Sequence, residues 1–212
     1  MKKHGKLLLK YLLLFVMTVF VMGCFSVSAA TKTGFVTQKG KTYYINKDGS
    51  KQKGWLELKG KKYYFNKKTG VQVKGWAKDS KGKRYFYNAN GAKGYMATGW
   101  LTDSKKNTRY FNPSTGYMKT KWATISNKKY YFYSGNGVAA KSTFLTDSKN
   151  VTRYFTSKCF MATGWATTST AKKRYFDPST GAMYTGFRKI GSYTYYFYKS
   201  KKSKGIMATG WV

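Results

Sequence analysis

Histidine, cysteine and proline are almost missing from this 212-residue sequence, and each shortage excludes a class of structure. Two prolines leave no stiff linker between domains. The single histidine, His4, and one of the two cysteines, Cys24, lie within the first thirty residues. The rest of the chain has only Cys159, so we expect no internal disulfide and no zinc site there. Cys159 occupies a position where other parts of the chain have a turn glycine, which indicates sequence drift rather than chemistry.

Carboxylates are equally scarce, with six in the whole chain. Three of them, Asp79, Asp103 and Asp147, begin the same Asp-Ser-Lys pattern in different places, and the others are Asp48, Glu57 and Asp177. A residue that recurs in one turn motif is typical of turn formation, because a catalytic pair is placed once, in one cleft. The sequence therefore predicts a protein that is not an enzyme, with no catalytic residues and no cofactor.

Positive charge is abundant, with 41 lysines and arginines and a net charge of +35. Without the four lysines of the first thirty residues the net charge is +31. Such a chain is attracted to polyanions, and salt weakens the attraction. Aromatic rings in a basic groove would suit single-stranded nucleic acid. The export signal described next and the spread of lysine over many turns instead favour anionic wall polymers or an acidic membrane surface.

The first thirty residues have the pattern of a secretory signal peptide. Lys2, Lys3, Lys6 and Lys10 precede an apolar run from 11 to 22, and small residues follow at 27–30. We expect cleavage after Ala29 or Ala30 and no integral membrane span in the mature protein, since the apolar run is short for a bilayer. Two alternatives remain open: an uncleaved signal anchor, and lipidation at Cys24 within the lipoprotein-like segment 21–24.

A repeat with a period of 20–24 residues covers the remainder of the chain. Glycine followed by an aromatic residue marks most copies, and Met-Ala-Thr-Gly-Trp occurs three times, at 96–100, 161–165 and 207–211. Successive copies are separated by 20, 21, 24, 22, 22, 21, 22 and 24 residues. A fixed period in this range is typical of one supersecondary unit stacked on the next.

Each copy contains two short aromatic segments separated by polar, turn-forming clusters, which predicts strand, turn, strand, turn. The second strand has tyrosine in its middle in all eight copies, with Arg84, Arg109, Arg153 and Arg174 before it in four of them. We expect these arginines to stack on neighbouring rings, as tyrosine would. One hairpin is marginal in water, so the hairpins must stack. The predicted fold is all-β: a β-hairpin solenoid of about eight hairpin repeats over residues 34–212, with 207–212 as a cap.

The order of Gly-Trp, aromatic strand, turn glycine, methionine and Gly-Trp, as in 75–100, resembles the cell-wall-binding repeats, also called choline-binding repeats. Related repeats occur in glucan-binding proteins and in the carbohydrate-binding domains of clostridial toxins, and the strands here look closer to those variants. The resemblance implies ligand sites between consecutive repeats, walled by aromatic rings and often floored by methionine. The implied walls from the Gly-Trp positions are Trp55, Trp76, Trp100, Trp122, Trp165 and Trp211. The implied tyrosines are Tyr44, Tyr64, Tyr85, Tyr110, Tyr131, Tyr154, Tyr175 and Tyr196. The implied floors are Met96, Met118, Met161, Met183 and Met207.

The sequence departs from the choline-binding pattern at one position. A second tryptophan before the tyrosine pair is replaced in every copy, by Thr42, Lys62, Lys83, Thr108, Lys129, Thr152, Lys173 and Thr194. A lysine ammonium at a cage wall should repel a quaternary ammonium.

We therefore predict a secreted, non-catalytic protein of the cell wall or surface of a Gram-positive-type bacterium. Its expected ligand is choline-bearing teichoic acid or a related envelope glycan, bound by many weak sites at once. One alternative is a module for glucan or host carbohydrate, and a second is a surface spacer with no ligand.

Overall fold

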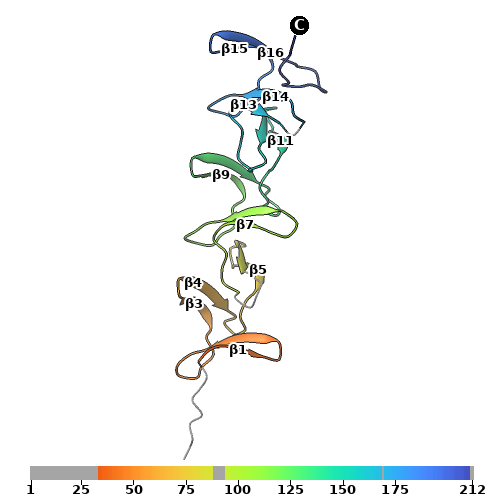
Figure 1. The fold of residues 1–212 in the computed structure, drawn as a ribbon. Helices are drawn as coiled ribbons and strands as arrows, with labels where there is room; N and C mark the ends of the chain where they lie inside the picture. Colours follow the sequence, from red (N-terminus) through yellow and green to blue (C-terminus); the bar gives the residue numbers. More distant parts are fainter. Residues whose placement is uncertain (1–32, 88–93, 169, 211–212) are drawn as a thin grey trace, which may run out of the picture. The chain divides into compact units, whose positions relative to one another are not determined.

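A computed structural model describes residues 33–87, 94–168 and 170–210. All regular structure in these ranges is β-strand, and the described residues contain no helix. The signal peptide predicted over 1–30 and Trp211 lie outside the described residues. The predicted all-β hairpin-repeat fold is confirmed, because sixteen strands pair within this described part as eight antiparallel two-stranded sheets (Figure 1).

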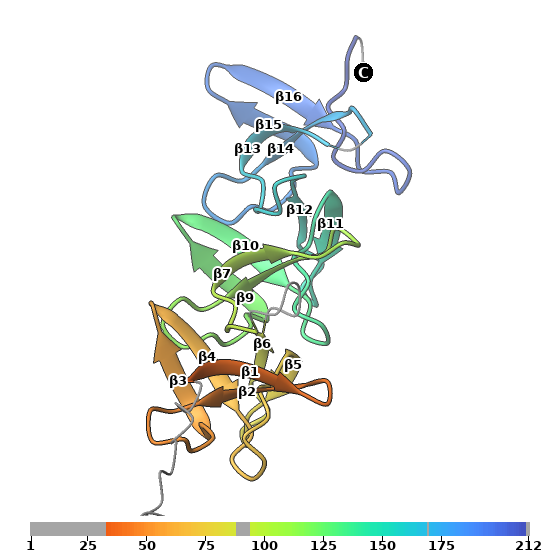
Figure 2. The same ribbon diagram turned by 60° about the horizontal axis from the view of Figure 1, so that its bottom comes forward.

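Consecutive strands form each hairpin, and their bounds follow the repeat period. The hairpins are β1 (Gly34–Gln38) with β2 (Lys41–Ile45), β3 (Gly54–Leu58) with β4 (Lys61–Phe65), β5 (Gly75–Lys78) with β6 (Arg84–Tyr87), β7 (Gly99–Thr102) with β8 (Thr108–Phe111), β9 (Lys121–Ile125) with β10 (Lys128–Phe132), β11 (Thr143–Thr146) with β12 (Thr152–Phe155), β13 (Gly164–Thr167) with β14 (Lys173–Phe176), and β15 (Gly186–Ile190) with β16 (Tyr193–Phe197). Figure 2 shows several of these hairpins with their two strands side by side.

Two kinds of turn close the hairpins. In the short turns after β1, β3 and β9 two residues have positive φ, as at Ser126 (47°) and Asn127 (59°) between β9 and β10. Such turns match the twist of the flanking strands. In the longer turns after β5, β7 and β11 an aspartate accepts hydrogen bonds from backbone N–H groups within the turn, and Asp103 Oδ1 accepts one from Asn107 at 2.9 Å. The turn after β13 has Thr168 at this position. The prediction that the repeated aspartates serve the turns is confirmed.

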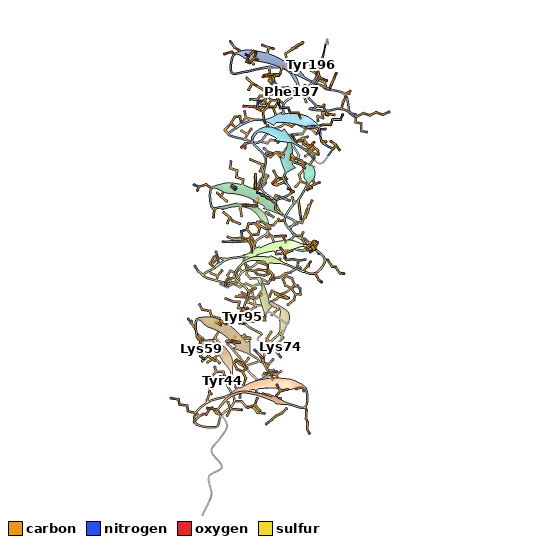
Figure 3. The ribbon with its side chains drawn as sticks, in the orientation of Figure 1. Tyr44, Lys59, Lys74, Tyr95, Tyr196 and Phe197 are labelled. Carbon is orange, nitrogen blue, oxygen red and sulfur yellow. The ribbon has the colours of Figure 1, made fainter. Side chains whose placement is uncertain are left out.

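The two faces of each hairpin differ in burial because side chains alternate along a strand. In β10 the burial alternates over the last three residues: Tyr130 and Phe132 are buried, and Tyr131 between them is partly exposed. The last position of the second strand is fully buried at Phe65, Phe111, Phe132, Phe155, Phe176 and Phe197. Each such side chain stabilises the fold by about 2 kcal/mol through burial. Figure 3 labels one of these core rings, Phe197, beside its partly exposed neighbour Tyr196.

The third hairpin corrects one prediction. The sequence pattern places Tyr85 in the middle of its second strand, as a ring of the implied site, and Lys83 at the position of the lost second tryptophan. The register instead pairs Trp76 with Phe86 and Lys78 with Arg84, so Arg84 takes the place assigned to Lys83. Tyr85 is buried on the other face. The pattern fails here because Arg84-Tyr85-Phe86-Tyr87 fits the aromatic motif in two registers, and Tyr87 fills the core position.

Two compact units make up the described chain, and in both of them successive repeats are joined by backbone hydrogen bonds. The first unit contains the residues up to Gly54 together with 65–72, and the second contains 55–64 and the residues from Val73 onward. In the first unit the N–H of Gln72 donates to the carbonyl of Thr42 at 2.8 Å. The second unit has the same bond at each step, from Met96 to Lys62, Met118 to Arg84, Ala139 to Thr108, Met161 to Lys129, Met183 to Thr152 and Met207 to Lys173. The segment that follows a hairpin is thus bonded to the hairpin one repeat earlier.

No helix in the described ranges is long and apolar enough to cross a membrane.

Candidate binding sites between repeats

Three side chains from two consecutive hairpins define each candidate site. The first strand supplies an aromatic residue, usually tryptophan, and the second strand supplies the ring directly opposite it. The third side chain comes from the next hairpin, and we call it the closing residue. In the second unit the closing residues that contact the first-strand ring are Tyr85, Arg109, Tyr130, Arg153, Arg174 and Tyr195.

The clearest aromatic corner is built around Trp100. Its ring centroid lies 5.0 Å from that of Tyr110 in the same hairpin and 4.9 Å from that of Tyr130 in the next. The planes are inclined by 65° and 57°, so the rings form walls rather than a parallel stack. Trp100 remains 42% exposed. Thr108 bonds to Thr102 through their hydroxyls at 2.9 Å, so this site has a hydroxyl pair where some other repeats have a lysine.

Two further sites have the same aromatic composition. Trp55 lies 5.0 Å from Tyr64 and 6.1 Å from the closing Tyr85, measured between ring centroids. Tyr85, predicted as a ring of the third hairpin's site, therefore contributes to the second hairpin's site.

The Trp165 site differs from the other two because a lysine of the protein lies over its tryptophan ring. Trp165 lies 5.1 Å from Tyr175 and 5.0 Å from the closing Tyr195. The Lys173 Nζ lies 4.7 Å from the Trp165 ring centroid. A cation of the protein thus takes the position in which a ligand cation would contact this ring.

Arginine replaces tyrosine as the closing residue in three sites of the second unit. The guanidinium carbons of Arg109, Arg153 and Arg174 lie 5.3, 5.7 and 5.0 Å from the ring centroids of Trp76, Trp122 and Phe144. The prediction that arginine stacks on a neighbouring ring is confirmed for these three. Arg84 belongs to a different register position.

Carboxylates hold two of these arginines in place. Arg109 Nη1 donates to Asp103 Oδ2 at 2.9 Å, and Arg153 Nη1 donates to Asp147 Oδ2 at 2.8 Å. The Arg109 hydrogen bond is the largest cause that lowers the pKa of Asp103, to about 2, and the Arg153 hydrogen bond likewise lowers the pKa of Asp147. Both carboxylates are ionised at neutral pH and keep the guanidinium planes fixed.

Open hollows lie over three of the tryptophans. The hollow at Trp122 has a volume of about 530 Å³ and is lined by Lys129, Asp147, Arg153 and Met161 among others. Trp76 borders one of about 380 Å³ and Trp55 one of about 320 Å³. Each combines a half-exposed ring with polar side chains from the following repeats.

The methionines have two roles in this arrangement. Met96 lines the Trp55 hollow and Met161 the Trp122 hollow, as expected for floors. Their side chains also pack against a turn glycine of the next repeat, so that a Cβ there would overlap with the sulfur. The pairs are Met96 with Gly116, Met118 with Gly137, Met161 with Gly181 and Met183 with Gly205. At the corresponding step after Trp100 the methionine is replaced by Ala139.

Sequence reasoning missed Tyr130 and Tyr195 as closing residues, and it missed the phenylalanines that replace tryptophan or tyrosine. Phe35, Phe86, Phe144 and Phe187 occupy cross-strand ring positions opposite Tyr44, Trp76, Tyr154 and Tyr196. The two-residue alternation of the second strand would have pointed to the closing position, which lies one residue before the cross-strand ring. Phe187 and Tyr196 lie 4.8 Å apart, between centroids, in the last hairpin, and Phe187 is 68% exposed.

Two family models of known repeats match parts of this chain. The model of the "Choline-binding repeat" matches residues 32–70, 57–93 and 147–186, and that of the "Putative cell wall binding repeat" matches 120–139 and 185–200. The sequences of curated proteins include no significant match.

Solved structures agree with the family models. The chain is similar to choline-binding protein F from Streptococcus pneumoniae, with 27% identity, a TM-score of 0.69, and coverage of 84% of this chain and 58% of that one. A structure of the same protein with ipratropium gives 26%, 0.68, 84% and 60%. The choline-binding domain of CbpL from Streptococcus pneumoniae gives 25%, 0.52, 84% and 87%. The chain thus spans under two thirds of choline-binding protein F. Hairpin repeats of this period, with rings from one repeat closed by the next, place the chain in the family of choline-binding, or cell-wall-binding, repeats.

Proposed function

We propose that this chain is an exported, non-catalytic module that attaches to a choline-bearing cell-wall polymer through aromatic corners between its repeats. Choline-binding repeats are binding modules, and the chain's similarity to them supports this function. The pattern of residues 1–30 supports export. A surface polymer with many choline groups would meet several sites of one chain, and the high effective concentration would convert weak sites into firm attachment.

The corner of Trp100, Tyr110 and Tyr130 is the observation that carries this proposal. A quaternary ammonium has no hydrogen-bond donor and is held by ring faces and apolar contact. Three inclined rings with a half-exposed indole supply such faces, and the neighbouring Thr108 carries no charge that would repel the ligand.

Calorimetric titration of the full chain with choline tests the proposal. Trp100→Ala should weaken choline binding about tenfold, which corresponds to about 1.4 kcal/mol, because one wall of the corner is lost. Trp122→Ala is the matched control, since it removes a similarly exposed indole, 50% against 42%, from a site closed by Arg153. Equal losses in both variants, or no heat of binding in the parent chain, would contradict the proposal.

Glycan binding is the second candidate, and the Trp122 hollow favours it. An exposed indole there stands beside the ion-paired Arg153 and Asp147, which could donate to and accept from sugar hydroxyls. Titration with glucan oligomers should then show the reverse order, with the larger loss in Trp122→Ala. A chain that responds to neither ligand would be a spacer.

A further inference from the structure

We propose that the hollow over Trp76 is an anion site that binds a phosphorylated sugar, with the sugar ring on the indole and the phosphate on the surrounding cations. This site is separate from the aromatic corners and does not depend on choline binding. Its lining consists of Trp76, Ala77, Lys78, Arg84, Arg109 and Asn136. All of these belong to the second unit, on β5 and β6, on β8, and in the segment after β10.

Both arginines of the Trp76 hollow are anchored by the backbone of one turn. Arg84 Nη1 donates to the Gly135 carbonyl at 2.6 Å, and Arg109 Nε donates to the Asn136 carbonyl at 3.0 Å. Because these side chains are held by the protein, a ligand need not immobilise them on binding. Each guanidinium has five N–H donors, so donors remain for the oxygens of a phosphate.

The charge of the Trp76 hollow distinguishes it from the other two. Lys78, Arg84 and Arg109 supply three positive charges, and its lining residues in the described chain include no carboxylate. Asp103 compensates one charge through its bond to Arg109, which leaves an excess of two.

The other two tryptophan hollows lack this excess. Trp122 has Lys129 and Arg153 against Asp147 in its lining, an excess of one. Trp55 has Lys62 against Glu57, which is neutral. A dianionic phosphate is therefore complementary to the Trp76 hollow and to neither of the others.

The indole gives the site its preference for a sugar over free phosphate. Trp76 is 49% exposed although Arg109 lies over part of its ring. An exposed indole presents a flat apolar surface to the C–H groups of a pyranose. A volume of about 380 Å³ holds one sugar and its phosphate. A quaternary ammonium is disfavoured in the same place by the three cations.

The test is calorimetric titration of the full chain at low ionic strength with glucose 1-phosphate, glucose, inorganic phosphate and glycerol 3-phosphate. We expect glucose 1-phosphate to bind at least tenfold more tightly than any of the other three. Equal binding of inorganic phosphate or of glycerol 3-phosphate would overturn the role of the indole, and equal binding of glucose would overturn that of the cations. No binding of glucose 1-phosphate would overturn the site altogether.

Variants locate the binding. Lys78→Gln with Arg84→Gln should weaken glucose 1-phosphate binding at least tenfold and leave choline binding unchanged. The control for net charge is Lys158→Gln with Lys201→Gln, two exposed lysines outside this lining. Equal losses in both double variants would show non-specific attraction and overturn the proposal. Choline titration of the same samples reports separately on the function proposed above, so that failure of one leaves the other measurable.

Discussion

At the residue scale, we propose that two side chains decide what kind of ligand each inter-repeat site accepts, the first of them being the closing residue. Tyr130 completes three aromatic walls around Trp100, whereas Arg153 at the equivalent position lays a guanidinium on Trp122. The position two residues before the cross-strand ring acts in the same way. Thr108 leaves the Trp100 corner uncharged, and Lys173 places an ammonium over Trp165.

Lys173→Thr should open the Trp165 corner to choline. The lysine Nζ lies 4.7 Å from the indole centroid, and threonine is the residue that other repeats have at this position. We expect one more choline bound per chain, or a several-fold rise in affinity, by calorimetry. Lys172→Thr, the exposed neighbour, serves as control. An unchanged titration in Lys173→Thr would show that the ammonium does not block the ring.

The Asp103–Arg109 pair predicts a dependence of stability on acid. The folded-state pKa of Asp103, about 2, lies below its ordinary value of 3.8. The stabilisation it gives is therefore fully present above about pH 4 and is lost as the pH falls toward 2. Asp103→Asn should reduce the fall of the melting temperature between pH 4 and pH 2 and lower the melting temperature at pH 7. Identical curves for Asp103→Asn and the parent chain would contradict the assignment.

At the element scale, consecutive hairpins are joined by a methionine that packs on a glycine. Met118 lies against Gly137, and Met161 lies against Gly181. Between these steps the pattern changes, because Ala139 replaces the methionine and Cys159 replaces the next glycine. Cys159 has a φ of 69°, like the glycines it replaces, and packs against Ala139 with Tyr130 and Phe132. Cys159 therefore fills the volume that the missing methionine leaves.

A double-mutant cycle tests this compensation. Ala139→Met alone should destabilise the chain by overpacking, by about 1–3 kcal/mol. Cys159→Gly alone should leave unfilled volume. Together they restore the pair found in the neighbouring repeats, so the double variant should be more stable than the sum of the single effects by about 1–3 kcal/mol. Denaturant unfolding measures all four corners of the cycle, and additive losses would mean that the two positions do not interact.

Sequence alone predicted the hairpins but not the detail of their sites. The glycine–aromatic period and the turn clusters specify the strands, since alternation and turn chemistry act locally. The register of the third hairpin was missed because Tyr85 and Phe86 are both acceptable rings opposite Trp76. The contact of Lys173 with Trp165 depends on a rotamer, which no spacing rule determines.

At the scale of the whole molecule, ring stacking and positive charge give different responses to salt. The chain has 41 basic residues and only six carboxylates, so it attracts any anionic polymer. Salt screens that attraction. Binding of choline in an aromatic corner depends on ring contact and little on long-range electrostatic attraction. We expect that raising the salt from about 0.05 to 0.5 M weakens binding of choline-free teichoic acid at least tenfold and that of choline less than twofold. Parallel losses for both ligands would mean that charge alone drives attachment.

A crystal structure of the chain with choline tests most directly whether rings of one repeat are closed by the next to form the ligand site. We expect a trimethylammonium group against Trp100, Tyr110 and Tyr130, with Lys173 still over Trp165 and no choline on the arginine-covered Trp122. Choline on Trp122, or an empty Trp100 corner at saturating choline, would contradict it.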